Sequence, residues 1–246
     1  PIHPVGSGAV GIDIGPQTIA YVSQSEAGLL ELASQVQNIE HQKSLLQRKM
    51  ERSRRATNPE NYMPDGTIKR GVKLTKNKSK HYRRLQQELA YLQHFQAETR
   101  KRQHIELANH LLSLGDCFYV EDMKWLSLTH RAKTTEISEK TGRMKRKKRF
   151  GKSIANKAPA ALIGILDTKC KSLGLPGVVK VPTKIKASQY NHQSDTYEKK
   201  SLGQRWNDMP SGERIQRDLY SAFLLQHVTP DLTGYNKEML VQDYPQ

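Results

Sequence analysis

Three acidic side chains lie in apolar stretches of the sequence, where an uncompensated carboxylate is energetically unfavourable. Asp13 lies in the run AVGIDI, Glu121 in CFYVEDM, and Asp218 in the apolar stripe of a predicted helix over 211–228. A charge buried alone is very costly, so Asp13 must lie near the open end of its strand, accept hydrogen bonds or bind a cation. Three converging carboxylates repel one another unless cations lie between them. Convergence would therefore predict Mg²⁺ or Mn²⁺, since these hard ions prefer oxygen ligands.

A pair of such ions would be suited to cutting a phosphodiester bond. Two divalent ions about 4 Å apart activate a water and stabilise the leaving 3′ oxygen when a phosphodiester bond is cut. Glu121 and its neighbour Asp122 are both candidates for the C-terminal end of a strand, where open α/β sheets hold their ligands. The simpler alternative is that Asp13 is a turn residue beside Gly15-Pro16, and that the three acids are unrelated cap or turn residues.

The composition favours a polyanionic partner. The 246 residues include 40 Lys and Arg against 24 Asp and Glu, which gives a net charge of +16 and a pI near 9.8. Nucleic acid or an acidic membrane surface would suit this charge. The chain has no apolar run of the roughly 20 residues that span a bilayer, and its start lacks a signal-peptide pattern. We therefore expect no membrane partner and a cytoplasmic protein, associated with the nucleoid when bound to DNA.

The hydrophobic pattern predicts an α/β chain. Apolar runs predict strands at 9–14, 19–23, 29–33, 117–123 and 177–181, the first three of which form an antiparallel start to a sheet. Helical spacing predicts a helix after Asn38, one long helix or two over 79–114, a helix over 158–173, and a last helix that begins near 211 or 212. Polar composition predicts an insertion at 57–78, a loop at 129–157 and an irregular excursion at 184–210. The tail beyond Thr229 has no predicted role.

Two basic clusters are expected to contact a nucleic-acid backbone without sequence preference. One is a face of the helix after Asn38, and the other lies in the predicted loop at 129–157. The alternative for each cluster is an ordinary solvated surface. The second cluster also has the composition of a localisation signal. Their members are Lys43, Arg48, Lys49, Arg52 and Arg55 in the first, and Lys145, Arg146, Lys147, Lys148, Arg149 and Lys152 in the second.

The three acids lie in motifs that carry a family resemblance. The segments GIDIG with Asp13, YVEDM with Glu121 and QRDLYSAFLL with Asp218 resemble the three split RuvC motifs of the TnpB (OrfB) family. These are transposon-encoded RNA-guided nucleases related to type V CRISPR effectors. The resemblance also includes KRFGKSIANKAPAALIGIL and KASQ, so it covers nearly all of residues 8–228.

This resemblance implies a fold and a set of roles. The fold would be RNase H-like (RuvC), a mixed five-stranded sheet flanked by helices, with a basic helical insertion at 38–114 in a nuclease core at 8–186. Asp13, Glu121 and Asp218 would hold two Mg²⁺ or Mn²⁺ ions in a site that cuts DNA, with Asp122 as a neighbour rather than a ligand. DNA strands and a guide RNA would be the partners.

Two departures from the family pattern limit these expectations. Family members carry a zinc ribbon of two CxxC pairs before the last acid, whereas residues 187–210 here contain no cysteine. Cys117 and Cys170 are isolated, so we expect a degenerate ribbon or lid without zinc, with His192 as an exposed loop residue. Residues 1–7 are expected to be a linker after a part that holds the guide. A nuclease-inactive, RNA-guided DNA-binding protein of repressor type is the alternative function.

Overall fold

The computed structural model describes residues 3–130, 133–139, 141–144, 150–201 and 203–244, and it consists of two compact units. The first unit contains Pro1–Ser34 and Arg102–Gln246, and the second contains Gln35–Lys101. The division falls inside a single long helix, α2 (Lys80–Leu114), and not at the end of that helix at residue 114. The region 79–114 is therefore one helix.

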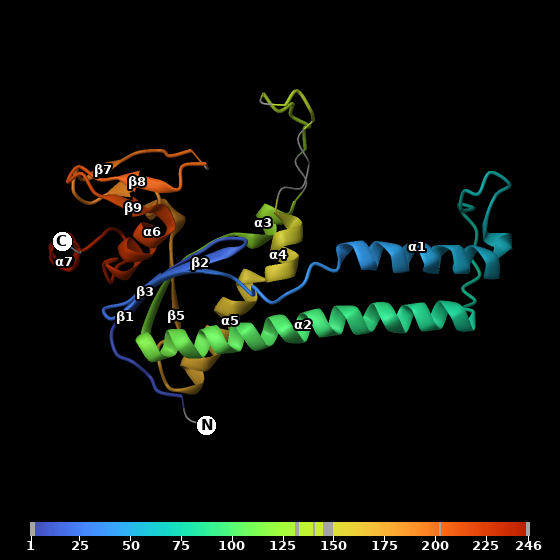
Figure 1. Cartoon of the computed structure of the whole chain (residues 1–246), viewed down its shortest axis with the longest axis horizontal. Helices are drawn as coiled ribbons and strands as arrows, with labels where there is room; N and C mark the ends of the chain where they lie inside the picture. Colours follow the sequence, from blue (N-terminus) through green and yellow to red (C-terminus); the bar gives the residue numbers. More distant parts are fainter. Residues whose placement is uncertain (1–2, 131–132, 140, 145–149, 202, 245–246) are drawn as a thin grey trace. The chain divides into compact units, whose positions relative to one another are not determined.

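A five-stranded mixed sheet forms the centre of the first unit (Figure 1). Its strands are β1 (Ala9–Ile14), β2 (Thr18–Val22), β3 (Ala27–Glu31), β4 (Cys117–Glu121) and β5 (Val178–Val181), in the order β3-β2-β1-β4-β5. The β1-β2 and β2-β3 pairs are antiparallel, whereas β4 pairs in parallel with both β1 and β5. The antiparallel start and the mixed five-stranded sheet predicted from the sequence are confirmed.

One face of the sheet is covered by the C-terminal part of α2 and by α5 (Pro159–Ser172). Val10 and Ile12 of β1 and Phe118 of β4 belong to a buried cluster that also contains Leu111 and Leu162 from the two helices. Alternation along β1 and β4 directs Asp13 and Glu121 away from this cluster, because they are odd-numbered residues on strands whose even-numbered residues form the core.

The opposite face of the sheet belongs to a second buried cluster around α6 (Arg217–Gln226). Two small hairpins contribute to this region, β6 (Tyr190–Asn191) with β7 (Thr196–Tyr197) and β8 (Trp206–Asp208) with β9 (Arg214–Gln216). These elements gather near α6 in the orange and red part of the chain (Figure 1). The segment 184–210, which the sequence predicts to be irregular, therefore contains the short paired strands β6, β7 and β8. No alternating apolar pattern marks these strands in the sequence.

The tail after Thr229, for which the sequence predicts no role, is part of the same cluster. The chain forms α7 (Lys237–Asp243), in which Leu240 is fully buried, and Tyr235 stacks on Tyr190 with ring centroids 4.6 Å apart. Tyr235 also donates a hydrogen bond to the Ile185 carbonyl oxygen in η2 (Thr183–Ile185). A few widely spaced apolar residues therefore anchor a segment that is polar on average.

Three further expectations need correction. The helix that carries Asp218 begins at Arg217 and not near 211, because residues 214–216 form β9, so Ile215 lies in a strand. The predicted loop at 129–157 begins at the end of α3 (Trp125–Thr129) and contains the helix α4 (Gly151–Lys157). His192 is half-buried, since its backbone N–H and its Nδ1 atom both lie within hydrogen-bond distance of the Tyr220 hydroxyl.

The second unit is helical. It contains α1 (Glu40–Thr57), the short helix η1 (Pro59–Asn61) and the N-terminal part of α2. The helix predicted after Asn38 is confirmed, and the Asn38 side chain accepts a hydrogen bond from the backbone N–H of Glu40 at 3.1 Å. No helix in the described ranges is long and apolar enough to cross a membrane.

Candidate active site

Asp13 lies near the C-terminal end of β1, on the face of the sheet that α6 covers. It pairs with Ala20 of β2 and is half-buried. Two residues earlier, Gly11 is on the same side of the strand because side chains alternate. The small residue therefore leaves space beside the strand, and the structure shows that a helix backbone uses this space.

Glu121 is the last residue of β4, directly beside β1. The two strands run in parallel with Ile12 opposite Val120. Asp13 and Glu121 are the next residues of their strands, so they also lie at matching positions. Side chains at matching positions of parallel neighbours point to the same face. Asp122 follows, with its backbone N–H donating to the Val181 carbonyl oxygen at 2.8 Å. Asp13 and Glu121 are thus neighbours at the C-terminal ends of parallel strands, where α/β sheets commonly bind ligands.

The third acid reaches this place because α6 packs directly against β1. A Cβ atom at Gly11 would overlap the Ala222 carbonyl oxygen and the Gln226 backbone nitrogen. The Gln226 side chain donates to the Ala9 carbonyl oxygen at 3.1 Å. Ala9 thus contacts Gln226, whereas Gly11, two residues later, also contacts Ala222, four residues earlier in the helix. The helix and the strand therefore run in opposite directions.

The same geometry predicts the partner of Asp13. Asp13 lies two residues after Gly11 on β1, a distance of about 6.6 Å along the strand. Asp218 lies four residues before Ala222 on α6, a distance of about 6 Å along the helix in the same direction. Asp218 is therefore brought close to Asp13, although 205 positions separate them in the sequence (218 − 13).

The ionisation of Asp13 depends on both of the other acids. The pKa of Asp13 is raised from 3.8 to about 7, chiefly by burial and then by the negative charges of Asp218 and Glu121, against smaller lowering effects of Arg217 and the Ser221 hydroxyl. Burial also raises the pKa of Glu121. Asp13 thus keeps its proton to near neutral pH because burial, and then the neighbouring negative charges, disfavour its ionised form.

Basic and amide groups engage the carboxylate of Asp218. Its Oδ1 atom lies 3.4 Å from Arg217 Nε, and its Oδ2 atom lies 3.8 Å from Arg205 Nη1. Gln216 donates to Oδ2 at 3.3 Å, and its own Oε1 atom caps α6 by accepting from the backbone N–H of Leu219 at 2.7 Å. Arg205 and Arg217 are site residues that sequence reasoning missed, although the position of Arg217 directly before Asp218 was a local signal.

The donor set suits a hard divalent cation, but the side chains are not arranged as a finished cage. Carboxylate oxygens are ligands that Mg²⁺ prefers, and the raised pKa of Asp13 indicates a place where added positive charge would be favourable. Within the described ranges, no three His, Cys, Asp or Glu side chains are placed closely enough to hold one ion as they stand.

The predicted basic residues belong to other elements than those that carry the three acids. Lys43, Arg48, Lys49, Arg52 and Arg55 belong to α1 in the second unit, where Lys43 pairs with Glu40 and Arg55 pairs with Glu51. Lys152 is exposed on α4. The other members of the second cluster, residues 145–149, lie outside the described residues.

Comparison with known proteins adds no assignment to this geometry. Neither the protein-family models nor the curated proteins that were searched give a match to the chain.

Proposed function

We propose that the chain is the catalytic core of a divalent-metal-dependent DNA endonuclease with an RNase H-like (RuvC) fold, of the RNA-guided TnpB type. The observation that carries the proposal is that Asp13 and Glu121 lie at adjacent ends of the parallel strands β1 and β4, while α6, which carries Asp218, packs on β1 at Gly11. The strand order β3-β2-β1-β4-β5 is compatible with this fold. The net charge of +16 suits DNA strands and a guide RNA as partners in the cytoplasm.

In this proposal Asp13, Glu121 and Asp218 hold two Mg²⁺ or Mn²⁺ ions. When bound, such ions supply an activated water and stabilise the leaving 3′ oxygen of the cut phosphodiester. Asp13 must first lose the proton that it retains to about pH 7. Arg205 and Arg217, which lie beside Asp218, would then be available to orient the anionic phosphate.

A second candidate is a nuclease-inactive, RNA-guided DNA-binding protein. The ion pairs of Asp218 with Arg217 and Arg205 favour it, because they occupy oxygens that a metal ion would need. The two candidates differ in whether DNA is cut after it is bound.

A plasmid assay separates the two candidates. We expect the chain, with its co-purified RNA, to convert supercoiled plasmid to nicked or linear DNA in Mg²⁺ and to leave it intact in excess EDTA. A gel-shift measurement in EDTA on the same samples reports binding alone. A plasmid that is shifted but never cut, in either Mg²⁺ or Mn²⁺, would contradict the nuclease and support the binding protein.

A further inference from the structure

The second unit contains a basic cavity that the proposed nuclease chemistry does not use. Its volume is about 240 Å³, and the lining comes from the end of α1, the segment after η1 and the start of α2. Five of its side chains carry the argument below, namely Arg54, Tyr62, Lys76, Lys78 and Tyr82. All of them belong to the second unit.

Two asparagines fix the wall of this cavity. The Asn61 side chain accepts from the backbone N–H of Thr75 at 2.8 Å and donates to its carbonyl oxygen at 2.6 Å. Asn58, which is fully buried, makes the same pair of bonds with Asn77 at 2.9 and 3.0 Å. Because both neighbours of Lys76 are held in this way, the backbone at Lys76 has a defined position.

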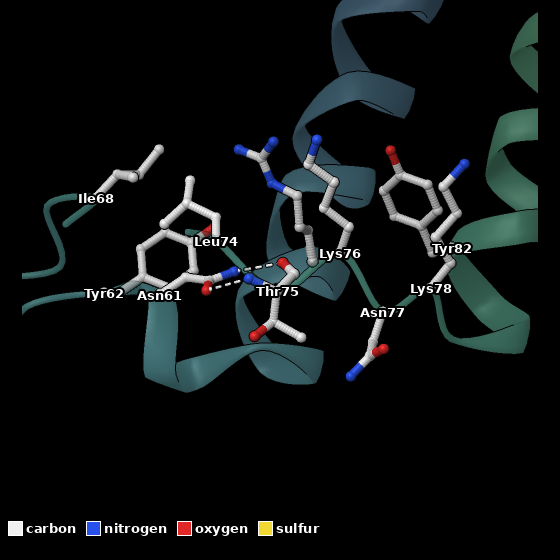
Figure 2. Close-up of a pocket in the computed structure, with 10 residues that line it drawn as sticks. Asn61, Tyr62, Ile68, Leu74, Thr75, Lys76, Asn77, Lys78 and Tyr82 are labelled. Atoms are coloured by element: carbon white, nitrogen blue, oxygen red, sulfur yellow. Dashed lines mark hydrogen bonds between the residues drawn. The ribbon is translucent and has the colours of Figure 1, made fainter. Parts of the chain in front are cut away.

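The cationic side chains are directed together. Figure 2 shows that the side chains of Lys76, Lys78 and Tyr82 point to the same side of this wall, and that Asn61 bonds to Thr75. The Lys78 Nζ atom lies 5.7 Å from the centre of the Tyr82 ring and donates to Gln86 at 3.2 Å. Arg54 pairs with Glu51; burial lowers the pKa of Arg54, but Glu51, and then Tyr62 and Tyr82, raise it above its ordinary value.

The charge of the cavity is positive. None of the described residues that line it is acidic, although Glu51 beside it pairs with Arg54 and accepts a hydrogen bond from the Tyr62 hydroxyl at 3.5 Å. Positive groups next to aromatic rings are the combination by which proteins bind single-stranded nucleic acid, with phosphates on the cations and bases against the rings.

We propose that this cavity binds one nucleotide of a single-stranded nucleic acid, with its base beside Tyr62 and Tyr82 and its phosphate on Lys76 and Lys78. The cavity volume of about 240 Å³ is smaller than that of sites that enclose whole small ligands, which measure about 300–1,000 Å³. It therefore favours one nucleotide of a longer strand over a free small molecule. The base must be unpaired, since a paired base cannot enter a side-chain pocket. The inference does not depend on the three acids of the first unit.

Fluorescence anisotropy of the chain in EDTA, where no cutting takes place, tests this site. The probes are 5′-labelled oligouridylate and oligodeoxythymidylate, which show whether ribose or deoxyribose strands bind more tightly. We expect Lys76→Gln combined with Lys78→Gln to weaken binding about tenfold and to lower the salt slope by about 1.4, since each single-strand phosphate contact contributes about 0.7. Tyr82→Leu should weaken binding about tenfold, and Tyr82→Phe should bind like the unchanged chain.

A charge-matched control separates a site from general attraction. Lys69→Gln combined with Arg70→Gln removes the same charge from the same connecting segment, and neither residue lines the cavity. We expect this control to weaken binding by about twofold or less, as a diffuse electrostatic contribution. Equal losses in the two double variants, unchanged binding in Tyr82→Leu, or binding to neither probe would overturn the inference. Lys76 and Lys78 are exposed, so the double variant tests it without disturbing the core.

Discussion

The Asp13→Asn chain is expected to lose DNA cleavage while its folded state becomes more stable at pH 8. Cleavage should fall about 10³-fold or more, because the amide cannot replace a charged ligand in a site that stabilises the transition state by several kcal/mol. The gain in stability has a different cause. In the unchanged chain without metal, an ionised Asp13 is held among Asp218 and Glu121 in a half-buried place.

The pH dependence follows from the direction of the pKa change. Because the pKa of Asp13 rises from 3.8 to about 7, the folded chain holds a proton between about pH 4 and pH 7 that the unfolded chain has lost. The free energy of unfolding therefore decreases as pH rises through this window. At 1.36 kcal/mol for each pH unit, the accumulated cost is at most about 4 kcal/mol above pH 7. Asn avoids this cost because it carries no charge.

Urea unfolding in EDTA at pH 5 and pH 8 measures this effect, with Asp167→Asn as a control of opposite sign. Asp167 accepts hydrogen bonds from Lys171 at 2.7 Å and from the Val178 backbone at 3.1 Å, and these contacts lower its pKa. Its replacement should reduce stability at pH 8 and leave cleavage unchanged. An Asp13→Asn chain that is less stable than the unchanged chain at pH 8, or that cuts DNA at the normal rate, would show that the acids do not share a site.

Gly11→Ala is the second substitution with a large expected effect. The added methyl group would overlap the backbone of α6 at Ala222 and Gln226, which cannot rotate away as a side chain would. Overpacking of this kind costs about 1–3 kcal/mol and more when backbone must shift. Movement of α6 would also separate Asp218 from Asp13, so we expect cleavage to fall together with stability.

Gly164→Ala in α5 is the matched control, since nothing lies within 4 Å of a Cβ atom there. Alanine stabilises a helix by about 1 kcal/mol relative to glycine, so this variant should be as stable as the unchanged chain or more stable. Thermal unfolding of the two variants and the plasmid assay are the measurements. If Gly11→Ala were tolerated as well as Gly164→Ala, α6 could not lie on β1 as described.

The sequence predicted the sheet because each strand carries its own pattern. Val10 and Ile12 alternate with Gly11 and Asp13, and Phe118 and Val120 alternate with Tyr119 and Glu121, so strand positions and faces follow from local alternation. The same alternation placed Asp13 beside small residues. The sequence did not show that Gly11 makes room for the backbone of a helix more than 200 positions later.

The errors occurred where pairing with residues outside the local pattern overrides helical spacing. Ile215 has helical spacing to Leu219 and Ala222, yet its backbone pairs with Asn207 in a hairpin, so the helix starts later than predicted. Leu240 and Tyr235 pack into a core whose other members lie elsewhere in the chain. The contact of Arg205 with Asp218 and the two asparagine clamps around Lys76 likewise join residues 13 to 19 positions apart, beyond the reach of a periodic pattern.

Binding of Mn²⁺ at pH 8, followed by the electron paramagnetic resonance signal of the free ion, tests the convergence of the three acids most directly. We predict that the chain binds two ions, and that Asp13→Asn, Glu121→Gln and Asp218→Asn each weaken binding by at least about 10- to 100-fold, as loss of a direct ligand should. Asp122→Asn should bind like the unchanged chain, because Asp122 neighbours the site without serving as a ligand. Mn²⁺ binding that is equal in all five proteins would contradict a shared metal site.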